Sequence, residues 1–103
     1  MTPLRWHPDT KEEITEAAAW YAAKREGLGA AFVDAVQAAA HAISVNPLRF
    51  SPLGHAPPDA QPRRALVSGF PYLVIYEVRT DHVLIVAVAH ERRRPGYWAR
   101  RRV

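Results

Sequence analysis

The sequence predicts an α+β fold in which an antiparallel helical hairpin packs on a C-terminal antiparallel sheet. Two stretches with apolar residues at helical spacing fill the first half, and strand-length runs of β-branched and aromatic residues fill the second. A proline-rich stretch separates the two halves. The 103 residues fit a single domain, residues 1–103, since domains usually have ~100–200 residues. Zero cysteines exclude a disulfide scaffold, an iron–sulfur centre and a cysteine nucleophile.

The chain begins with a short strand followed by a helix. Residues 4–6 form an extended run before His7 and Pro8, and a proline biases the residue before it away from helix. Asp9 or Thr10 is the expected cap, so the helix is predicted to start near residue 10. One helical face carries Ile14, Ala17, Ala18, Tyr21, Ala22 and Arg25.

A second helix follows after about three residues, which predicts an antiparallel hairpin. Gly27 is the expected C-cap of the first helix, and Pro47 ends the second. Alanine-rich facing stripes should let the two helices approach closely. Residues 47–62 contain five prolines and are predicted to be a loop. The second helical stripe consists of Phe32, Ala35, Val36, Ala39, Ala40 and Ile43.

Three strands are predicted next, at 63–67, 70–79 and 82–89, joined as an antiparallel meander. If residues 80–81 form the turn, both faces of the last two strands are apolar. The hairpin covers one face only, so the other needs the C-terminal segment or a partner protein, which indicates a binding surface. The expected register places Tyr76 opposite Ile85 and Val74 opposite Ala87, with Ile75 and Val86 sharing the other face.

The charge indicates an acidic partner. The formal net charge is +4, the pI is near 10.0, and twelve of the fourteen cationic residues are arginine. The planar guanidinium suits phosphate and carboxylate, so either a nucleic acid or an acidic protein fits. No apolar run is expected to reach the ~18–20 residues that a membrane span needs, and the N-terminus lacks a secretory signal pattern, so a cytoplasmic location is expected.

The arginine-rich end of the chain is the main candidate binding site. It follows the last strand, and guanidinium groups beside aromatic rings bind phosphate and stack on bases. The competing interpretation is a solvated basic end, although two large aromatics usually pack on something. Residues 100–102 are expected to be solvated. The target-binding candidates are Arg92, Arg93, Arg94, Tyr97 and Trp98.

Other titratable residues give weaker signals. His90 at the strand end could act as a general acid or base or bind phosphate, or have only an ordinary backbone partner. Glu12, Glu13 and Glu16 are explained by capping and by the helix dipole. The histidines have no zinc-ligand spacing, so neither a metal nor a cofactor is predicted.

The predicted elements follow one another in a characteristic order over nearly the whole chain: a strand, a helical hairpin, a proline-rich loop, a three-stranded meander and a basic tail. The residues that carry the pattern are Tyr21 with Gly27, Leu28, Gly29 and Phe32; Asn46 and Pro47; Arg63 and Arg64; Phe70, Pro71, Tyr72 and Tyr76; and His90 through Pro95 with Tyr97 and Trp98. Together they resemble the RelE/ParE family of bacterial toxins, which includes plasmid stabilisation proteins.

The resemblance implies a growth-inhibiting cytoplasmic toxin of a type II toxin–antitoxin pair. It implies a hetero-oligomer with a neighbour-encoded, acidic antitoxin whose extended C-terminal part wraps over the helices and the sheet. The family has two branches. One cleaves messenger RNA on the ribosome without metal, and the other inhibits DNA gyrase by binding.

Residue by residue, the resemblance favours the ParE-type branch. The ribonuclease branch sets several basic side chains on the middle strands, where this chain has Arg64 but also Leu66 and Leu73. We therefore expect a toxin that acts by binding, with DNA gyrase as the implied target, and leave enzymatic activity open. The alternative is an mRNA endoribonuclease acting on the ribosome, and a non-toxic relative is a third possibility. The catalytic candidates for the ribonuclease are Arg64, His90, Arg92 and Tyr97.

Overall fold

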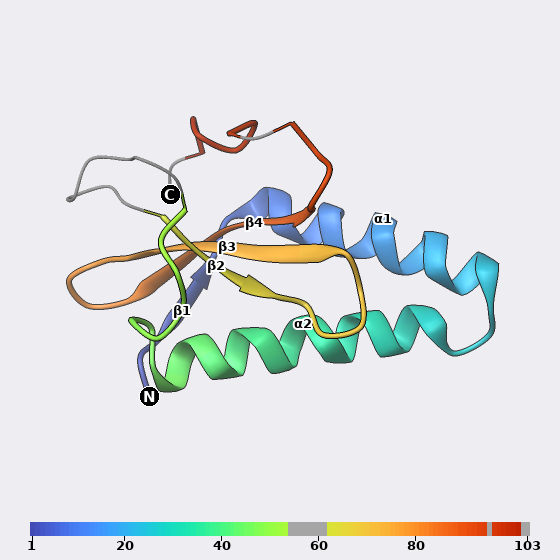
Figure 1. Ribbon diagram of the computed structural model, residues 1–103, viewed down its shortest axis with the longest axis horizontal. Coiled ribbons are helices and arrows are strands. Elements are labelled where there is room, and N and C mark those ends of the chain that lie inside the picture. Colours follow the sequence, from blue (N-terminus) through green and yellow to red (C-terminus); the bar gives the residue numbers. More distant parts are fainter. Residues whose placement is uncertain (54–61, 95, 102–103) are drawn as a thin grey trace.

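A computed structural model describes residues 1–53, 62–94 and 96–101. Four strands form one sheet in the order β1-β4-β3-β2 (Figure 1). β1 runs parallel to β4, whereas the other neighbours are antiparallel. The α+β prediction is confirmed, and the short N-terminal strand joins the edge of the sheet. The elements are β1 (Leu4–Trp6), α1 (Pro8–Lys24), α2 (Leu28–Val45), β2 (Arg63–Leu66), β3 (Tyr72–Val78) and β4 (Val83–His90).

The first helix begins slightly earlier than expected. α1 starts at Pro8, whose fixed φ and missing N–H suit the first helical position. The cap is His7 rather than Asp9 or Thr10, because the His7 Nδ1 accepts a hydrogen bond of 3.1 Å from the Asp9 N–H. Thr10 is buried instead, and its hydroxyl donates to the His7 carbonyl at 2.6 Å.

The helical hairpin and its connection of three residues are confirmed, but the connection lies at residues 25–27, so Leu28 and Gly29 already belong to α2. Arg25 caps the end of α1, and Gly27, expected in that role, is the N-cap of α2 with φ +82°. Glycine adopts this left-handed conformation without steric cost. The helices approach so closely that a Cβ added at Gly29 would lie 2.5 Å from the Ala18 carbonyl oxygen.

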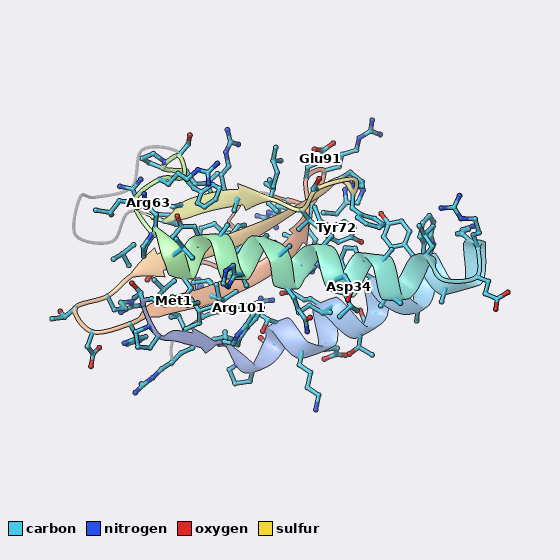
Figure 2. The ribbon with its side chains drawn as sticks, turned by 90° about the horizontal axis from the view of Figure 1, so that it is seen from below. Met1, Asp34, Arg63, Tyr72, Glu91 and Arg101 are labelled. Carbon is cyan, nitrogen blue, oxygen red and sulfur yellow. The ribbon has the colours of Figure 1, made fainter. Side chains whose placement is uncertain are left out.

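The main core lies between the hairpin and one face of the sheet. Figure 2 shows α2 in front of the sheet with α1 beside it. The α2 stripe is confirmed, since Phe32 and Ile43 are fully buried, whereas Ala22 and Arg25 of the predicted α1 stripe are exposed. The buried members are Ala17, Phe32, Val36, Ala39, Ile43, Ala65, Val67, Val74, Tyr76, Val83, Ile85 and Val88.

α2 is also an apolar helix of membrane-spanning length, contrary to the expectation from the sequence. Residues Leu28–Val45 have a mean hydropathy of 1.4 over 18 residues. Its Phe32, Val36 and Ile43 side chains pack against the sheet with 0–1% exposure. Core helices of folded domains meet the same length and composition criterion.

A β-bulge changes the register of the last hairpin. The predicted pair of Tyr76 with Ile85 is confirmed, but Val74 pairs with Val88 rather than with Ala87. The register shifts between Ile75 and Tyr76, where β4 carries one extra residue. Because successive strand residues point to opposite faces, the insertion places Val88 toward the helices.

The second face of the sheet is covered by the end of the chain itself. Residues 96–101, here called the C-terminal segment, lie on the side of the sheet opposite α2 (Figure 1). Trp98 is only 9% exposed because it packs on this face. The sequence analysis expected either the C-terminal segment or a partner protein on this face, and in the structure the C-terminal segment lies there. The buried residues under it are Ile75, Leu84, Val86, Ala87 and Ala89.

The first part of the predicted loop follows α2 without regular structure and is fixed to the sheet. The hydroxyl of the buried Tyr76 donates to the Pro47 carbonyl, and the Arg63 guanidinium donates to the Phe50 carbonyl at 2.6 Å. Residues 54–61 of the predicted loop lie outside the described residues.

Candidate functional site

Most of the predicted site residues meet at one hollow of about 490 Å³ on the second face of the sheet. We call it the arginine hollow. Leu73, Ile75 and Ala89 contribute apolar side chains to its lining, and Arg92 is the one candidate that does not line it. The site candidates that do are Arg64, His90, Arg93, Arg94, Tyr97 and Trp98.

Arg92, Arg93 and Arg94, here called the arginine segment, are exposed just after β4. The Arg93 guanidinium carbon lies 4.0 Å from the centroid of the Tyr97 ring, which is a cation–π contact. A tight turn follows β4, and it is closed by a hydrogen bond of 2.9 Å from the Arg93 N–H to the His90 carbonyl.

His90 has the ordinary backbone partner that the sequence analysis considered. Its Nδ1 accepts a hydrogen bond of 3.0 Å from the Arg92 N–H, so the neutral ring carries its proton on Nε2. The ring also meets Tyr72 edge-on, with 5.2 Å between centroids. In this arrangement His90 offers a hydrogen-bond donor rather than a base.

Tyr97 is half-buried, and its hydroxyl donates to the Glu13 carboxylate. Burial raises the pKa of Tyr97 well above 10.0, and the hydrogen bond and charge of Glu13 raise it further. The phenol therefore keeps its proton at neutral pH, so Tyr97 is poorly suited to act as a general base.

The remaining candidates are divided between the core and the surface. Trp98 is buried on the sheet, which leaves little of its side chain to contact a partner. Arg64 is exposed on β2. Beside it Leu66 is 70% exposed, and Leu73 lines the arginine hollow, so this part of the sheet stays largely apolar.

Glu13 and Arg101 form an ion pair that the sequence analysis missed. Their side chains are only 12% and 15% exposed, so Arg101 is not solvated and Glu13 does more than complement the helix dipole. Arg101 Nη1 lies 3.0 Å from Glu13 Oε1, and Arg101 Nη2 lies 3.1 Å from Glu13 Oε2. Burial lowers the pKa of Arg101, but the hydrogen bonds and charge of Glu13 outweigh it and raise the pKa.

The pair forms where β4 loses its neighbouring strand. β1 pairs with β4 only as far as Ile85. Beyond it, the Val88 N–H donates to Glu13 at 3.0 Å, and Arg101 donates to the Val86 carbonyl at 3.0 Å. Buried backbone groups need such partners, so the two side chains replace strand pairing along this edge.

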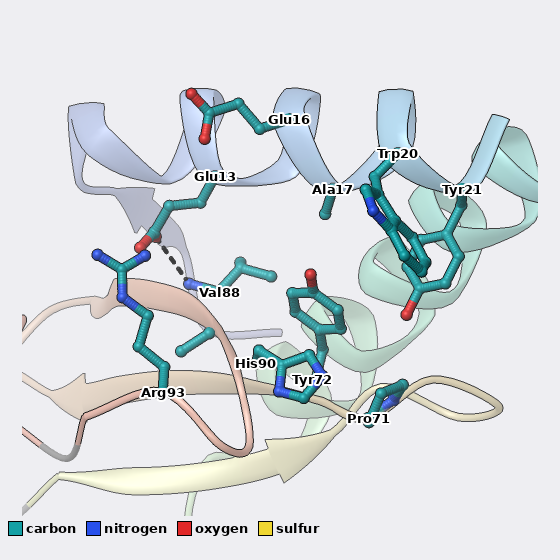
Figure 3. Close-up of a pocket in the computed structure, with 11 residues that line it drawn as sticks. Glu13, Glu16, Ala17, Trp20, Tyr21, Pro71, Tyr72, Val88, His90 and Arg93 are labelled. Carbon is teal, nitrogen blue, oxygen red and sulfur yellow. Dashed lines mark hydrogen bonds between the residues drawn. The ribbon is translucent and has the colours of Figure 1, made fainter. Parts of the chain in front are cut away.

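A second hollow, the aromatic groove, lies between α1 and the ends of β3 and β4 and has a volume of about 520 Å³. In Figure 3 Trp20 and Tyr21 of α1 face Tyr72 and His90 across it, and Arg93 points toward Glu13. Trp20 is 58% exposed, although its ring packs edge-on against Tyr21. The groove thus combines an exposed aromatic ring with charged residues at its rim.

Across residues 1–53, 62–94 and 96–101, no cluster of three or more His, Asp or Glu side chains is placed to hold a metal ion.

Comparison with known proteins identifies the family. A family model described as ParE toxin of type II toxin-antitoxin system, parDE, matches residues 4–95, and residues 96–101 lie beyond the match. A search of curated proteins found no match. The family match confirms the resemblance seen in the sequence, and it implies a cognate antitoxin as a partner. The chain belongs to the ParE toxin family of type II toxin–antitoxin systems.

Proposed function

We propose that this toxin inhibits bacterial growth by binding an essential target with the arginine segment, and that the target is DNA gyrase. The main support is the position of the arginine segment, whose three exposed side chains follow β4 beside the arginine hollow, which is lined in part by apolar residues. Guanidinium groups pair with carboxylates on an acidic protein surface, and the apolar lining adds contact area. In this proposal the toxin acts in the cytoplasm, where gyrase is found.

The chemistry of the site supports binding over catalysis. General acid–base catalysis is most efficient when the catalytic pKa lies near the working pH. The pKa of Tyr97 is raised, and the Nδ1 of His90 accepts a backbone hydrogen bond. The positive charge that lines the arginine hollow comes from Arg64, Arg93 and Arg94, and the apolar Leu73 lines it as well.

Induced expression in a bacterial host tests this function. We expect growth arrest with filamentation while bulk translation continues, which is the pattern of a topoisomerase target. Replacing the arginine segment with alanine should abolish the arrest at equal protein level. Arg25→Ala is the matched control, because Arg25 is exposed at the far turn of the hairpin. An arrest that survives loss of the three arginines, or no arrest at verified expression, would contradict the proposal.

We further propose that an acidic antitoxin neutralises the toxin by docking in the aromatic groove. The family match supports the existence of the partner, and the net charge of +4 supports its acidic character. Burying the 58% exposed ring of Trp20 would supply hydrophobic stabilisation, while Arg93 at the rim is available to a carboxylate.

A ribosome-dependent mRNA endoribonuclease is the second candidate. It is favoured by the convergence of Arg64, His90 and Tyr97 on one hollow. Purified ribosomes carrying a defined message test it. Message cleavage that is lost in His90→Ala or Tyr97→Phe would support the ribonuclease, and an uncut message would exclude it.

A further inference from the structure

We propose that Glu13, on α1, is a positioning residue for the arginine segment: it fixes Tyr97, and the Tyr97 ring fixes Arg93. The inference rests on the proposed function, because it assigns a binding role to Arg93. It concerns contacts made by residues 96–101, beyond the range of the family match.

Both oxygens of the Glu13 carboxylate are engaged. Oε1 accepts from the Val88 N–H and from Arg101 Nη1, each at 3.0 Å. Oε2 accepts from Arg101 Nη2 at 3.1 Å and from the Tyr97 hydroxyl. One carboxylate therefore joins α1 to β4 and to two residues of the C-terminal segment. Because its side chain is only 12% exposed, water competes weakly for these contacts.

Tyr97 carries this constraint to Arg93. Its hydroxyl is held by Glu13, so the orientation of the ring is set from α1. The Arg93 guanidinium carbon lies 4.0 Å from the ring centroid. An exposed arginine side chain normally samples many rotamers, and ordering it on binding costs entropy. A ring that holds the guanidinium in place before the target arrives reduces this cost.

Glu13 also neutralises a charge that would displace Arg93. The Arg101 guanidinium carbon lies 5.1 Å from the same ring, so two cations share one aromatic side chain. Like charges repel, and two carboxylates offset the charge of Arg101: Glu13 at 3.0 Å, which is largely buried, and the exposed Asp9 at 3.5 Å. Neutralising the Glu13 carboxylate should therefore weaken the hold on the Tyr97 hydroxyl, because an amide oxygen accepts a weaker hydrogen bond than a carboxylate, and should loosen Arg93 on the ring.

The first test is a double-mutant cycle in the growth assay, measured as the amount of toxin that halves the growth rate. We expect Glu13→Gln to require about tenfold more protein, as for loss of one well-placed interfacial contact. When equal amounts of folded toxin are compared, Glu13→Gln should have no further effect in an Arg93→Ala background, because its role in binding passes through Arg93. Glu12→Gln, an exposed neighbour on α1, is the control and should behave as the unmutated protein.

The outcomes separate the inference from the proposed function. Equal effects of Glu13→Gln with and without Arg93 would mean that Glu13 acts through stability alone, which overturns the inference. Loss of toxicity in Arg93→Ala but not in Glu13→Gln would also overturn it and leave the proposed function intact. Full toxicity of Arg93→Ala would overturn the inference, and the proposed function falls if toxicity also survives replacement of all three arginines.

The second test does not depend on any target. In solution NMR, Arg93 side-chain protons over the Tyr97 ring should be shifted upfield by the ring current. We expect this shift to collapse in Glu13→Gln while the signals of β3 keep their positions. Tyr97→Phe, which keeps the ring but removes the hydroxyl, is the second variant in case Glu13→Gln fails to fold, and it should also lose most of the shift. An unchanged Arg93 shift in either folded variant would overturn the positioning role.

Discussion

Arg93 lies over the ring of Tyr97, with its guanidinium carbon 4.0 Å from the ring centroid, while the hydroxyl of the same tyrosine donates to Glu13. Tyr97 and Glu13 are 84 positions apart in the sequence. A single aromatic side chain thus links α1 to the arginine segment that follows β4. This link helps to hold the C-terminal segment, residues 96–101, against the sheet.

Removing the Tyr97 hydroxyl should destabilise the fold moderately. Tyr97→Phe deletes one hydrogen bond to a largely buried carboxylate, which typically costs about 1.5–3 kcal/mol of unfolding free energy. Tyr97→Leu should cost more, because it also removes the ring that Arg93 and Arg101 contact. Urea denaturation measures both, and equal stability of Tyr97→Phe and the unmutated protein would contradict the hydrogen bond.

Stability should fall at alkaline pH. Burial raises the pKa of Tyr97 in the folded protein above its ordinary value of 10.0, and burial raises the pKa of Tyr72 and Tyr76 as well. The unfolded chain loses these protons near pH 10 while the folded protein keeps them. The stabilisation is therefore fully present below pH 10 and is lost as the pH rises toward the folded value.

The loss of stability at alkaline pH should be smaller in Tyr97→Phe than in the unmutated protein. Denaturation at pH values from 8 to 11 should show a shallower decline for this variant, since one of the shifted phenols is gone. A decline as steep as in the unmutated protein would mean that Tyr97 does not hold its proton in the folded state.

The close contact of the two helices makes Gly29 sensitive to substitution. A Cβ there would lie 2.5 Å from the Ala18 carbonyl oxygen, so Gly29→Ala must push the helices apart. Overpacking usually costs about 1–3 kcal/mol, which should outweigh the gain of up to about 1 kcal/mol in helix propensity. Ala30→Ser, at an exposed neighbouring position, is the control. A thermal melt in which Gly29→Ala is more stable would contradict the packing.

Trp20 should matter for the antitoxin and little for the fold. Because the ring is 58% exposed, Trp20→Ala should change unfolding free energy by less than about 1 kcal/mol. Affinity for the purified cognate antitoxin should fall by about tenfold or more, as for an aromatic anchor. Leu48→Ala is the matched control, since Leu48 is 65% exposed outside the aromatic groove. Equal antitoxin affinity of the two variants would place the docking surface elsewhere.

Local patterns in the sequence predicted the helices, the strands and their order along the chain, but not the parallel pairing of β1 with β4. Helical spacing identified the buried stripe of α2, and Pro47 marked its end, because these signals lie within a few residues of the structure that they determine. The pair of Tyr76 with Ile85 followed from the position of the turn alone. Beyond it the register failed, since the bulge at Val86 carries no glycine or proline that would mark it.

The candidate site was only partly predictable for a related reason. The arginines and aromatics after β4 were visible as a local cluster, and the apolar second face indicated that a cover was needed. Glu13 has the sequence context of an ordinary first-turn acid, and Arg101 that of a solvated terminus. Their contact depends on the free edge of β4, which forms only after β1 stops pairing at Ile85. No pattern of local residues encodes such a long-range meeting.

The most direct test of the central claim is a DNA supercoiling assay with purified gyrase, using the unmutated toxin and Arg93→Ala side by side. The account predicts that the unmutated toxin inhibits supercoiling and that Arg93→Ala requires about tenfold more protein for the same inhibition. Unimpaired supercoiling at a large excess of folded toxin, or equal inhibition by both proteins, would contradict it.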